Sequence, residues 1–411
     1  KSHKGEENIF RFLEWLNDMV RLATALGDQF PFEQYKGIDD FPRIEVEFFH
    51  LAALPESGPG KLLILDTPGF NEDGQQEDLL SIIQEQLKKA SAVLTVLDYT
   101  QLKSDAESKL RAELNAIAEQ SKGRMFALVN KFDQCSSNSM NESDTRDYVS
   151  RTLLSNFIPS EKIFPVSSHW AYLSQRAQLA LAEGGIQWKE GQEESWIDDF
   201  GIEVFGKKWK KLISDSEEVK GGAHSLWKAS LFNSPLENVI RFVYRDISPN
   251  NKQGNDISGA DTKNAATNSY QSPEKSEILS LEDIKNRLQA LAEQKRKTEE
   301  LKMVLAVVGT MKAGKSTTIN AIVGREILPN RNRPMTALPT LIEHKRGQKT
   351  PVLHFEKRKP IEELAARLRK KIKQMQPRER EKITDGDTHL EKTLTNLLGK
   401  NEIATRHKGE E

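Results

Sequence analysis

The stretch that most constrains this chain is "VLAVVGTMKAGKSTT", residues 304–318. An apolar run typical of a buried strand breaks into a loop that Gly309 and Gly314 bracket, and Lys315 and Ser316 follow directly. Because "STTINAIVG" can continue as a helix, the loop lies between a strand and a helix N-terminus. Backbone N–H groups in such a loop bind phosphate, so the pattern predicts a P-loop.

The side chains of this loop have separate expected roles. Lys315 would contact the β- and γ-phosphates of a nucleotide, and the Ser316 hydroxyl would coordinate Mg²⁺. The residues that we expect to surround the phosphates are Gly309, Met311, Lys312, Ala313, Gly314, Lys315, Ser316 and Thr317.

A second motif follows the predicted strand in "LLILDTPGF", residues 62–70. Asp66 is expected to hold the Mg²⁺ shell through water, and the N–H of Gly69 to sense the γ-phosphate. Both lie at the carboxyl end of a strand, where ligands bind in open α/β sheets.

A third motif selects the base. "FALVNKFD", residues 126–133, ends another predicted strand with Asn130, Lys131 and Asp133. The Asp133 carboxylate can accept two hydrogen bonds from N1 and N2 of guanine, whereas adenine offers an acceptor at N1 and would leave the carboxylate poorly paired. The motif therefore predicts GTP rather than ATP.

A third strand end, in "IFPVSSHW" (163–170), completes the expected base site. Ser167 and Ser168 are expected to present backbone N–H groups to the guanine O6.

Short apolar or β-branched runs alternate with amphipathic stretches, which predicts an α/β fold with a mostly parallel sheet flanked by helices. The predicted strands are 45–51, 61–65, 92–97, 124–129, 163–166, 303–308, 339–344 and 352–355. Helices are predicted over 278–302 and 360–399, and a tryptophan-containing helical insert over 188–227.

Composition sets limits on partners. The 60 Lys and Arg residues nearly balance the 61 Asp and Glu residues, so the overall charge gives no signal for a nucleic acid or an anionic membrane. The single cysteine, Cys135, and the lack of a signal peptide or a membrane-spanning run lead us to expect a cytoplasmic protein. The histidine spacing predicts no zinc site.

The motifs together resemble those of the dynamin-like GTPases of bacteria. The resemblance rests on 309–317, "LPNRNRPMTALPT" (328–340), the DTPG at 66–69 and the NKFD at 130–133. It implies a GTPase that hydrolyses GTP to GDP with Mg²⁺, forms a homodimer through its nucleotide face, and has a link to the replication clamp. It also implies that Thr336 is the switch threonine that closes over Mg²⁺ and the γ-phosphate, with Thr340 as the second choice.

The chain departs from the family pattern at several points. Phe70 follows the DTPG where many small GTPases have a water-orienting glutamine, so another group must position water. Lys312 either offsets transition-state charge, in cis or across a dimer, or is a solvent-exposed lysine at the loop tip. The family's long stalk is missing, which leaves 9–27, 233–245 and 278–302 to form a short neck.

The motif order is a rotation of the family order. DTPG, NKFD and VSS precede the P-loop, and moving 278–411 ahead of 1–246 restores the usual sequence. Residues 247–277 are rich in Asn, Ser, Gly and Lys and are expected to be a flexible linker. Because "HKGEE" occurs at 3–7 and again at 407–411, we interpret the chain as a circular permutant, with a natively permuted GTPase of another family as the alternative.

Two functions therefore stay open from sequence. One is an active GTPase stimulated by head-to-head dimerisation. The other is a slow GTP-dependent switch or binding module in which GTP orders the segment around Thr336 to recruit a partner.

Overall fold

The described part of the chain is interrupted by gaps. The computed structural model describes residues 2–51, 61–68, 77–103, 114–136, 139–186, 188, 195–245, 302–329 and 338–398, apart from 116, 120, 122, 156, 311, 385 and 386. The predicted linker at 247–277 and the predicted helix at 278–302, except its last residue, lie outside these ranges.

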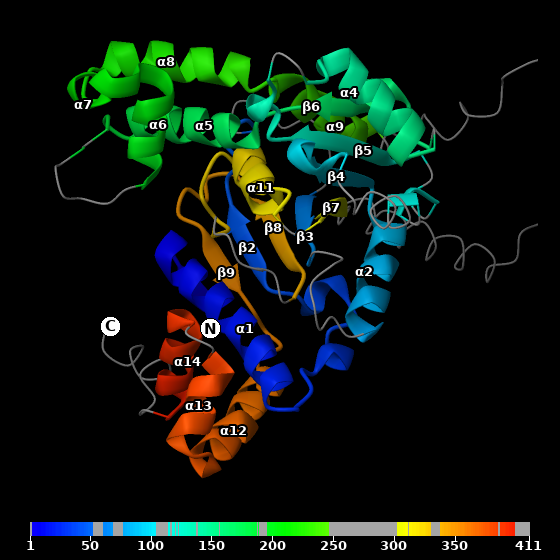
Figure 1. Cartoon of the computed structure of the whole chain (residues 1–411), viewed down its shortest axis with the longest axis vertical. Helices are drawn as coiled ribbons and strands as arrows, with labels where there is room; N and C mark the ends of the chain where they lie inside the picture. Colours follow the sequence, from blue (N-terminus) through cyan, green and yellow to red (C-terminus); the bar gives the residue numbers. More distant parts are fainter. Residues whose placement is uncertain are drawn as a thin grey trace, which may run out of the picture.

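A nine-stranded sheet, in the order β1-β9-β2-β8-β3-β7-β4-β5-β6, organises the described residues (Figure 1). The strands are β1 (Ser2–Lys4), β2 (Arg43–Val46), β3 (Lys61–Asp66), β4 (Ala92–Asp98), β5 (Met125–Asn130), β6 (Ile163–Pro165), β7 (Lys302–Gly309), β8 (Thr340–His344) and β9 (Val352–His354). The five strands β3, β7, β4, β5 and β6 run parallel, whereas β8 runs antiparallel to β3. The predicted α/β class is confirmed, although β1 was not predicted and β2 lies earlier than 45–51.

The strand that leads into the P-loop lies inside this sheet. β7 pairs with β3 on one side, where Asp66 faces Val307, and with β4 on the other, where Val96 faces Gly309. After Lys302 every residue of β7 is buried. The late position of β7 in the chain therefore does not keep it from the centre, because ladder hydrogen bonds depend on spatial neighbours alone.

Helices surround the sheet and extend it at two ends (Figure 1). They are α1 (Glu6–Ala25), α2 (Glu77–Lys89), α4 (Glu142–Tyr148), α5 (Ser168–Ala182), α6 (Ser195–Phe205), α7 (Trp209–Leu212), α8 (Ser216–Ala229), α9 (Asn233–Arg245), α11 (Lys315–Val323), α12 (Lys359–Gln374), α13 (Pro377–Thr384) and α14 (Thr388–Leu398). The lobe of α5 to α8 confirms the predicted helical insert, in which Trp196 and Trp209 are buried. The predicted helical region at 360–399 is divided into α12, α13 and α14.

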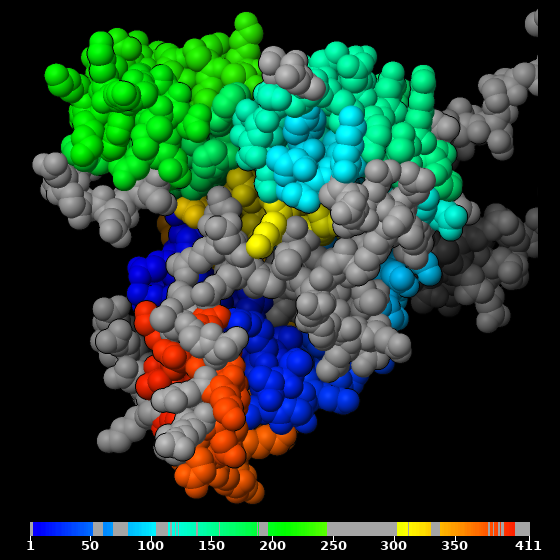
Figure 2. Space-filling view, viewed as in Figure 1, coloured from blue at the N-terminus to red at the C-terminus, as the bar shows by residue number. Residues whose placement is uncertain are grey.

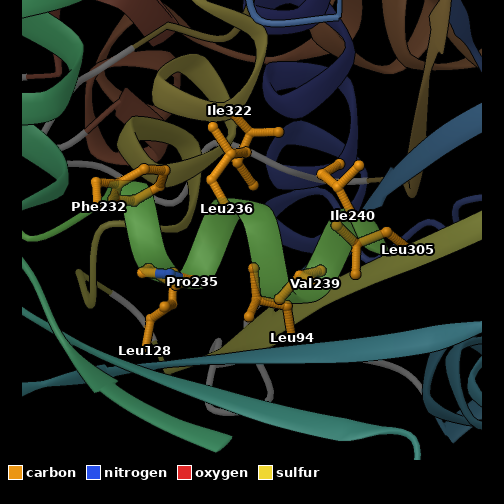
Figure 3. Close-up of a pocket in the computed structure, with 9 residues that line it drawn as sticks. All are labelled: Leu94, Leu128, Phe232, Pro235, Leu236, Val239, Ile240, Leu305 and Ile322. Atoms are coloured by element: carbon orange, nitrogen blue, oxygen red, sulfur yellow. The ribbon is translucent and has the colours of Figure 1, made fainter. Parts of the chain in front are cut away.

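Helix α9 packs along one face of the sheet (Figure 3). Its apolar side faces Leu94, Leu128 and Leu305 from β4, β5 and β7, and the Phe242 ring lies edge-on to Phe126 at 5.1 Å. The gap that remains between them has room of about 10 Å³ and only apolar walls. That is barely the room one water needs, and a water there would find no polar partner, so we interpret the gap as a packing defect.

Helix α1 also packs onto the domain. Ile9 and Met19 are fully buried, and α14 binds α1 through a hydrogen bond from Thr393 Oγ1 to Asp18 Oδ2 at 2.6 Å. The segments 9–27 and 233–245, predicted as pieces of a neck, pack with their apolar stripes against other elements of the domain, and their role as a neck stays a prediction.

Candidate functional site

The P-loop backbone makes two close approaches that only glycine permits. A Cβ on Gly309 would lie 2.3 Å from the carbonyl oxygen of Val96 in β4. A Cβ on Gly314, whose φ is +91°, would lie 2.2 Å from Nδ2 of Asn130. Glycine at these two positions therefore lets the loop lie directly against β4 and against the NKFD segment.

The loop ends at the N-terminus of helix α11, where the helix dipole places a partial positive charge. Gly314 is the N-cap of α11 and supplies no side-chain cap to the N–H groups of the first turn. The Lys315 ammonium lies beside this terminus and donates to the carbonyls of Gly309 at 3.0 Å and Thr310 at 3.2 Å. Helix dipole and ammonium together form a cradle for an anion such as phosphate.

The other predicted P-loop residues differ in exposure. Ala313 and Thr317 are buried, Ser316 is half-buried, and Lys312 is exposed with a left-handed φ of 64°. Met311 lies outside the described residues.

Asp66 brings a carboxylate next to this cradle. It ends β3 with 1% of its surface exposed and faces Val307 in β7, two residues before Gly309. Carboxylate and hydroxyl oxygens are ligands that Mg²⁺ prefers, and Mg²⁺ usually binds one or two carboxylates together with substrate phosphates. Asp66 and Ser316 therefore fit the Mg²⁺ that the resemblance implies.

Only one of the two predicted switch threonines lies among the described residues. Thr336 lies outside the described residues, as does Gly69 of the DTPG. Thr340 is buried at the start of β8, opposite Asp66, and its hydroxyl donates to the carbonyl of Leu338 at 3.3 Å.

Asn130 joins the phosphate side of the site to the base side. Its Nδ2 donates to the carbonyl of Ala313 in the P-loop at 2.8 Å, and its Oδ1 accepts from the N–H of Ser168 at 2.9 Å. The side chain is 4% exposed, so both bonds are shielded from water. A buried amide with both ends paired fixes the distance between the two segments.

The next two polar residues of the NKFD motif lie at the surface of this site. Lys131 adopts a left-handed φ of 64°, and its Nζ lies 2.5 Å from Oδ2 of Asp98. Asp133 is half-buried in the turn that follows, and no hydrogen bond or ion pair from the described residues engages its carboxylate. A carboxylate in that state is suited to accept the two donors of guanine.

The predicted roles of Ser167 and Ser168 need a correction. The N–H of Ser167 donates to the carbonyl of Ser230 at 2.9 Å, and that of Ser168 donates to Asn130. Ser167 instead acts as the N-cap of α5, because its Oγ accepts from the N–H of Trp170 at 3.2 Å. Both backbone donors are thus used inside the protein.

One backbone donor at this position, the N–H of His169, was not predicted from the sequence. Within the described residues no acceptor pairs with the N–H of His169, in the first turn of α5 between Ser168 and Trp170. The signal was available, because an N-cap serine satisfies the N2 or N3 donor and leaves the other orphaned.

The site therefore collects segments from distant parts of the chain. Figure 2 shows the yellow segment 302–329 reaching the surface in the middle of this face, below the cyan, turquoise and green segments that follow β4, β5 and β6. The fold joins these segments because β3, β7, β4 and β5 are neighbours in that order and run parallel, so their carboxyl ends meet at one edge.

A P-loop on a central strand, a buried aspartate ending the neighbouring strand and an NKFD turn are together consistent with a P-loop GTPase domain. The matches to known proteins agree with this class. Residues 305–404 match the model of the dynamin family. Two curated relatives, each described as clamp-binding protein CrfC, come from Escherichia coli strain K12 and from Escherichia coli, and each is 43% identical over 249 residues.

These alignments cover 60% of this chain and 33% of each relative, so the chain spans about a third of the length of the relatives it matches. No solved structure matches the chain. No described helix has both the length and the apolar character required to cross a bilayer. The family match and the relatives support a GTPase of the dynamin-like class.

Proposed function

We propose that this chain binds GTP together with Mg²⁺ and hydrolyses it to GDP and phosphate. The observation that carries the proposal is the Asn130 amide, which bonds Ala313 in the P-loop and Ser168 at the start of α5. One buried side chain thereby links a phosphate cradle to a base-reading turn, which is what a guanine nucleotide requires.

The roles of the residues follow from their chemistry. The Lys315 ammonium and the first turn of α11 bind the β- and γ-phosphates, and the Asp133 carboxylate accepts from guanine N1 and N2. The N–H of His169 is the donor that we assign to the guanine O6. Ser316 and Thr336 would hold Mg²⁺ directly and Asp66 through water, and the bound ion would neutralise charge that develops between the phosphates.

Lys312 is our candidate for the group that offsets transition-state charge. Its exposed side chain leaves the P-loop from a left-handed backbone position, and at such a position a non-glycine residue is uncommon. Because the loop is exposed there, Lys312 can act on the bound phosphates of its own site or on those of a second subunit.

We propose that two copies of the chain pair through their nucleotide faces and that pairing stimulates hydrolysis. The relatives are named for clamp binding, and a link of this chain to a replication clamp is a proposal that rests on the likeness alone. A slow GTP-dependent switch that recruits such a partner is the second function, favoured by a β8 that begins directly after the segment containing Thr336.

A turnover assay across a protein dilution series separates these functions. For a dimer-stimulated GTPase, GTP turnover per molecule rises with protein concentration. For a switch, GTP turnover per molecule is slow and does not change with protein concentration, while GTP tightens binding to a partner. In the same assay Lys315→Ala should lose nucleotide binding, and Asp133→Asn should shift preference from guanine to xanthine. GTP binding by the Lys315→Ala variant at parental affinity would overturn the site assignment.

We also propose that the chain is a circular permutant, with 1–246 and 278–411 as two parts of one GTPase domain joined by the linker 247–277. Two observations support this. β7 pairs with β3 and β4, and near the chain's two ends β1 pairs with β9 while α1 packs on α14. Intact-mass analysis of the protein against its gene tests the order, and a coding sequence that begins with the P-loop half would refute it.

A further inference from the structure

The carboxylate of Asp98 lies at the same sheet edge as the NKFD turn. Asp98 ends β4 and stands beside Asn130 in the ladder between β4 and β5. Parallel neighbours end together, so β4, which ends at Asp98, and β5, which is followed by Lys131, end at the same edge of the sheet. The residue is 8% exposed, and no role is predicted for it from the sequence.

Each oxygen of the Asp98 carboxylate has a distinct partner. Oδ1 accepts from the N–H of Thr100 at 2.9 Å and from its hydroxyl at 2.7 Å, which makes Asp98 the cap of the turn 99–101. Oδ2 is left to face Lys131, whose Nζ lies 2.5 Å away. The turn therefore holds the carboxylate rigidly, with one oxygen aimed at the lysine.

The backbone of Lys131 is fixed as firmly as the carboxylate. Asn130 before it bonds both the P-loop and α5, and the N–H of Phe132 after it donates to the carbonyl of Val166 at 3.1 Å. With the backbone fixed at one end and the ammonium at the other, the four methylenes between them lose their freedom. Ordering a lysine side chain costs rotamer entropy, and the ion pair with Asp98 has already ordered this side chain before a ligand binds.

We propose that Asp98 is a positioning residue for the purine: by binding the Lys131 ammonium it stretches the lysine stem into a fixed apolar strip against which the ring face of the bound base lies. This inference rests on the proposed GTP site and adds to it an apolar contact surface formed by the Lys131 stem, here called the floor. The edge of the base is read by Asp133, whereas the floor contacts the face that all purines share. Asp98 should therefore set how tightly purine nucleotides bind, and leave the choice between them unchanged.

The test is Asp98→Asn, with binding of GTP, GDP and ITP measured by titration and GTP turnover measured at saturation. The neutral amide keeps an acceptor for Thr100 but loses the charge that holds Lys131. We expect all three nucleotides to bind roughly tenfold more weakly by the same factor, since one charge-assisted bond is lost. KM for GTP should rise by that factor while kcat at saturation stays at the parental value.

Asp40→Asn is the matched control. Asp40 also caps a short turn, accepting from the N–H of Gly37 at 2.9 Å, and also binds a lysine, Lys357, at 2.7 Å. It lies where the turn 38–40 meets the segment before α12, so its loss should leave nucleotide binding unchanged.

A double-mutant cycle with Lys131→Met shows whether Asp98 acts through the lysine. Methionine keeps an apolar stem without the charge, so adding Asp98→Asn to it should cause no further loss of affinity. If Asp98→Asn folds poorly, the affinity of Lys131→Met for the three nucleotides tests the inference alone, because this variant removes the same ion pair from the lysine side. Additive losses, unchanged affinity in Asp98→Asn, or unequal losses for GTP and ITP would overturn the inference. A parent chain that binds none of the three nucleotides would instead refute the GTP site itself.

Discussion

The half-buried imidazole of His50 makes the stability of this fold sensitive to mild acid. His50 follows β2 and lies between α5 and α8, where its Nε2 contacts the Gln175 amide and its ring lies tilted against Trp227, with the ring centroids 4.8 Å apart. Burial lowers the pKa of His50 from 6.5 to about 4, and the Gln175 contact opposes part of that shift. The fold therefore favours the neutral ring.

The sign and size of the effect follow from linkage. Above the unfolded pKa both states hold a neutral ring, so the contribution is fully present there and is lost as the pH falls from 6.5 toward 4. At about pH 5 the unfolded chain is almost fully protonated at this site and the folded chain is not, which costs about 2 kcal/mol of unfolding free energy.

Urea unfolding at about pH 7.5 and about pH 5 measures this loss. The parent is compared with His50→Gln, which cannot titrate, and with His224→Gln, which removes an exposed histidine from α8. Groups such as His344, whose pKa burial also lowers, change all three proteins alike and cancel. His50→Gln should lose about 2 kcal/mol less than the parent between the two pH values, and His224→Gln should match the parent. Equal losses in the parent and in His50→Gln would refute the reasoning.

Three further outcomes are expected at the site. Gly309→Ala should abolish nucleotide binding, because its methyl group would meet a β4 carbonyl at 2.3 Å; a titration that gives parental affinity would contradict this. Asn130→Ala should destabilise the fold by roughly 2–4 kcal/mol, since a buried carbonyl and a buried N–H lose their partner; chemical unfolding measures it, and a change under about 1 kcal/mol would count against the bridge. Lys312→Ala should lower kcat with GTP binding retained, and an unchanged kcat would remove Lys312 from the mechanism.

Much of the fold could be read from local sequence. The runs that became β3, β4, β5 and β7 are continuous apolar segments of strand length, and burial on both faces of a parallel sheet requires that composition. β1 could not be found in this way, because Ser2, His3 and Lys4 have no strand pattern and become a strand only by pairing with β9. The packing partners of α1 and α9 could not be predicted either, because an amphipathic stripe shows that a helix is buried and does not show against what.

The sequence by itself predicted the chemistry of the proposed site: a glycine loop with Lys315 and Ser316 for phosphate, Asp66 for a metal shell, and the Asn130 to Asp133 turn for guanine. These are properties of residue type and short spacing, so they survive any order along the chain. The tertiary structure decided which donors are available, because it pairs the N–H groups of Ser167 and Ser168 inside the protein and, among the described residues, gives no acceptor to that of His169. It also decided that Asp98 belongs beside Lys131, since strands β4 and β5 bring together two residues that lie 33 positions apart in the chain.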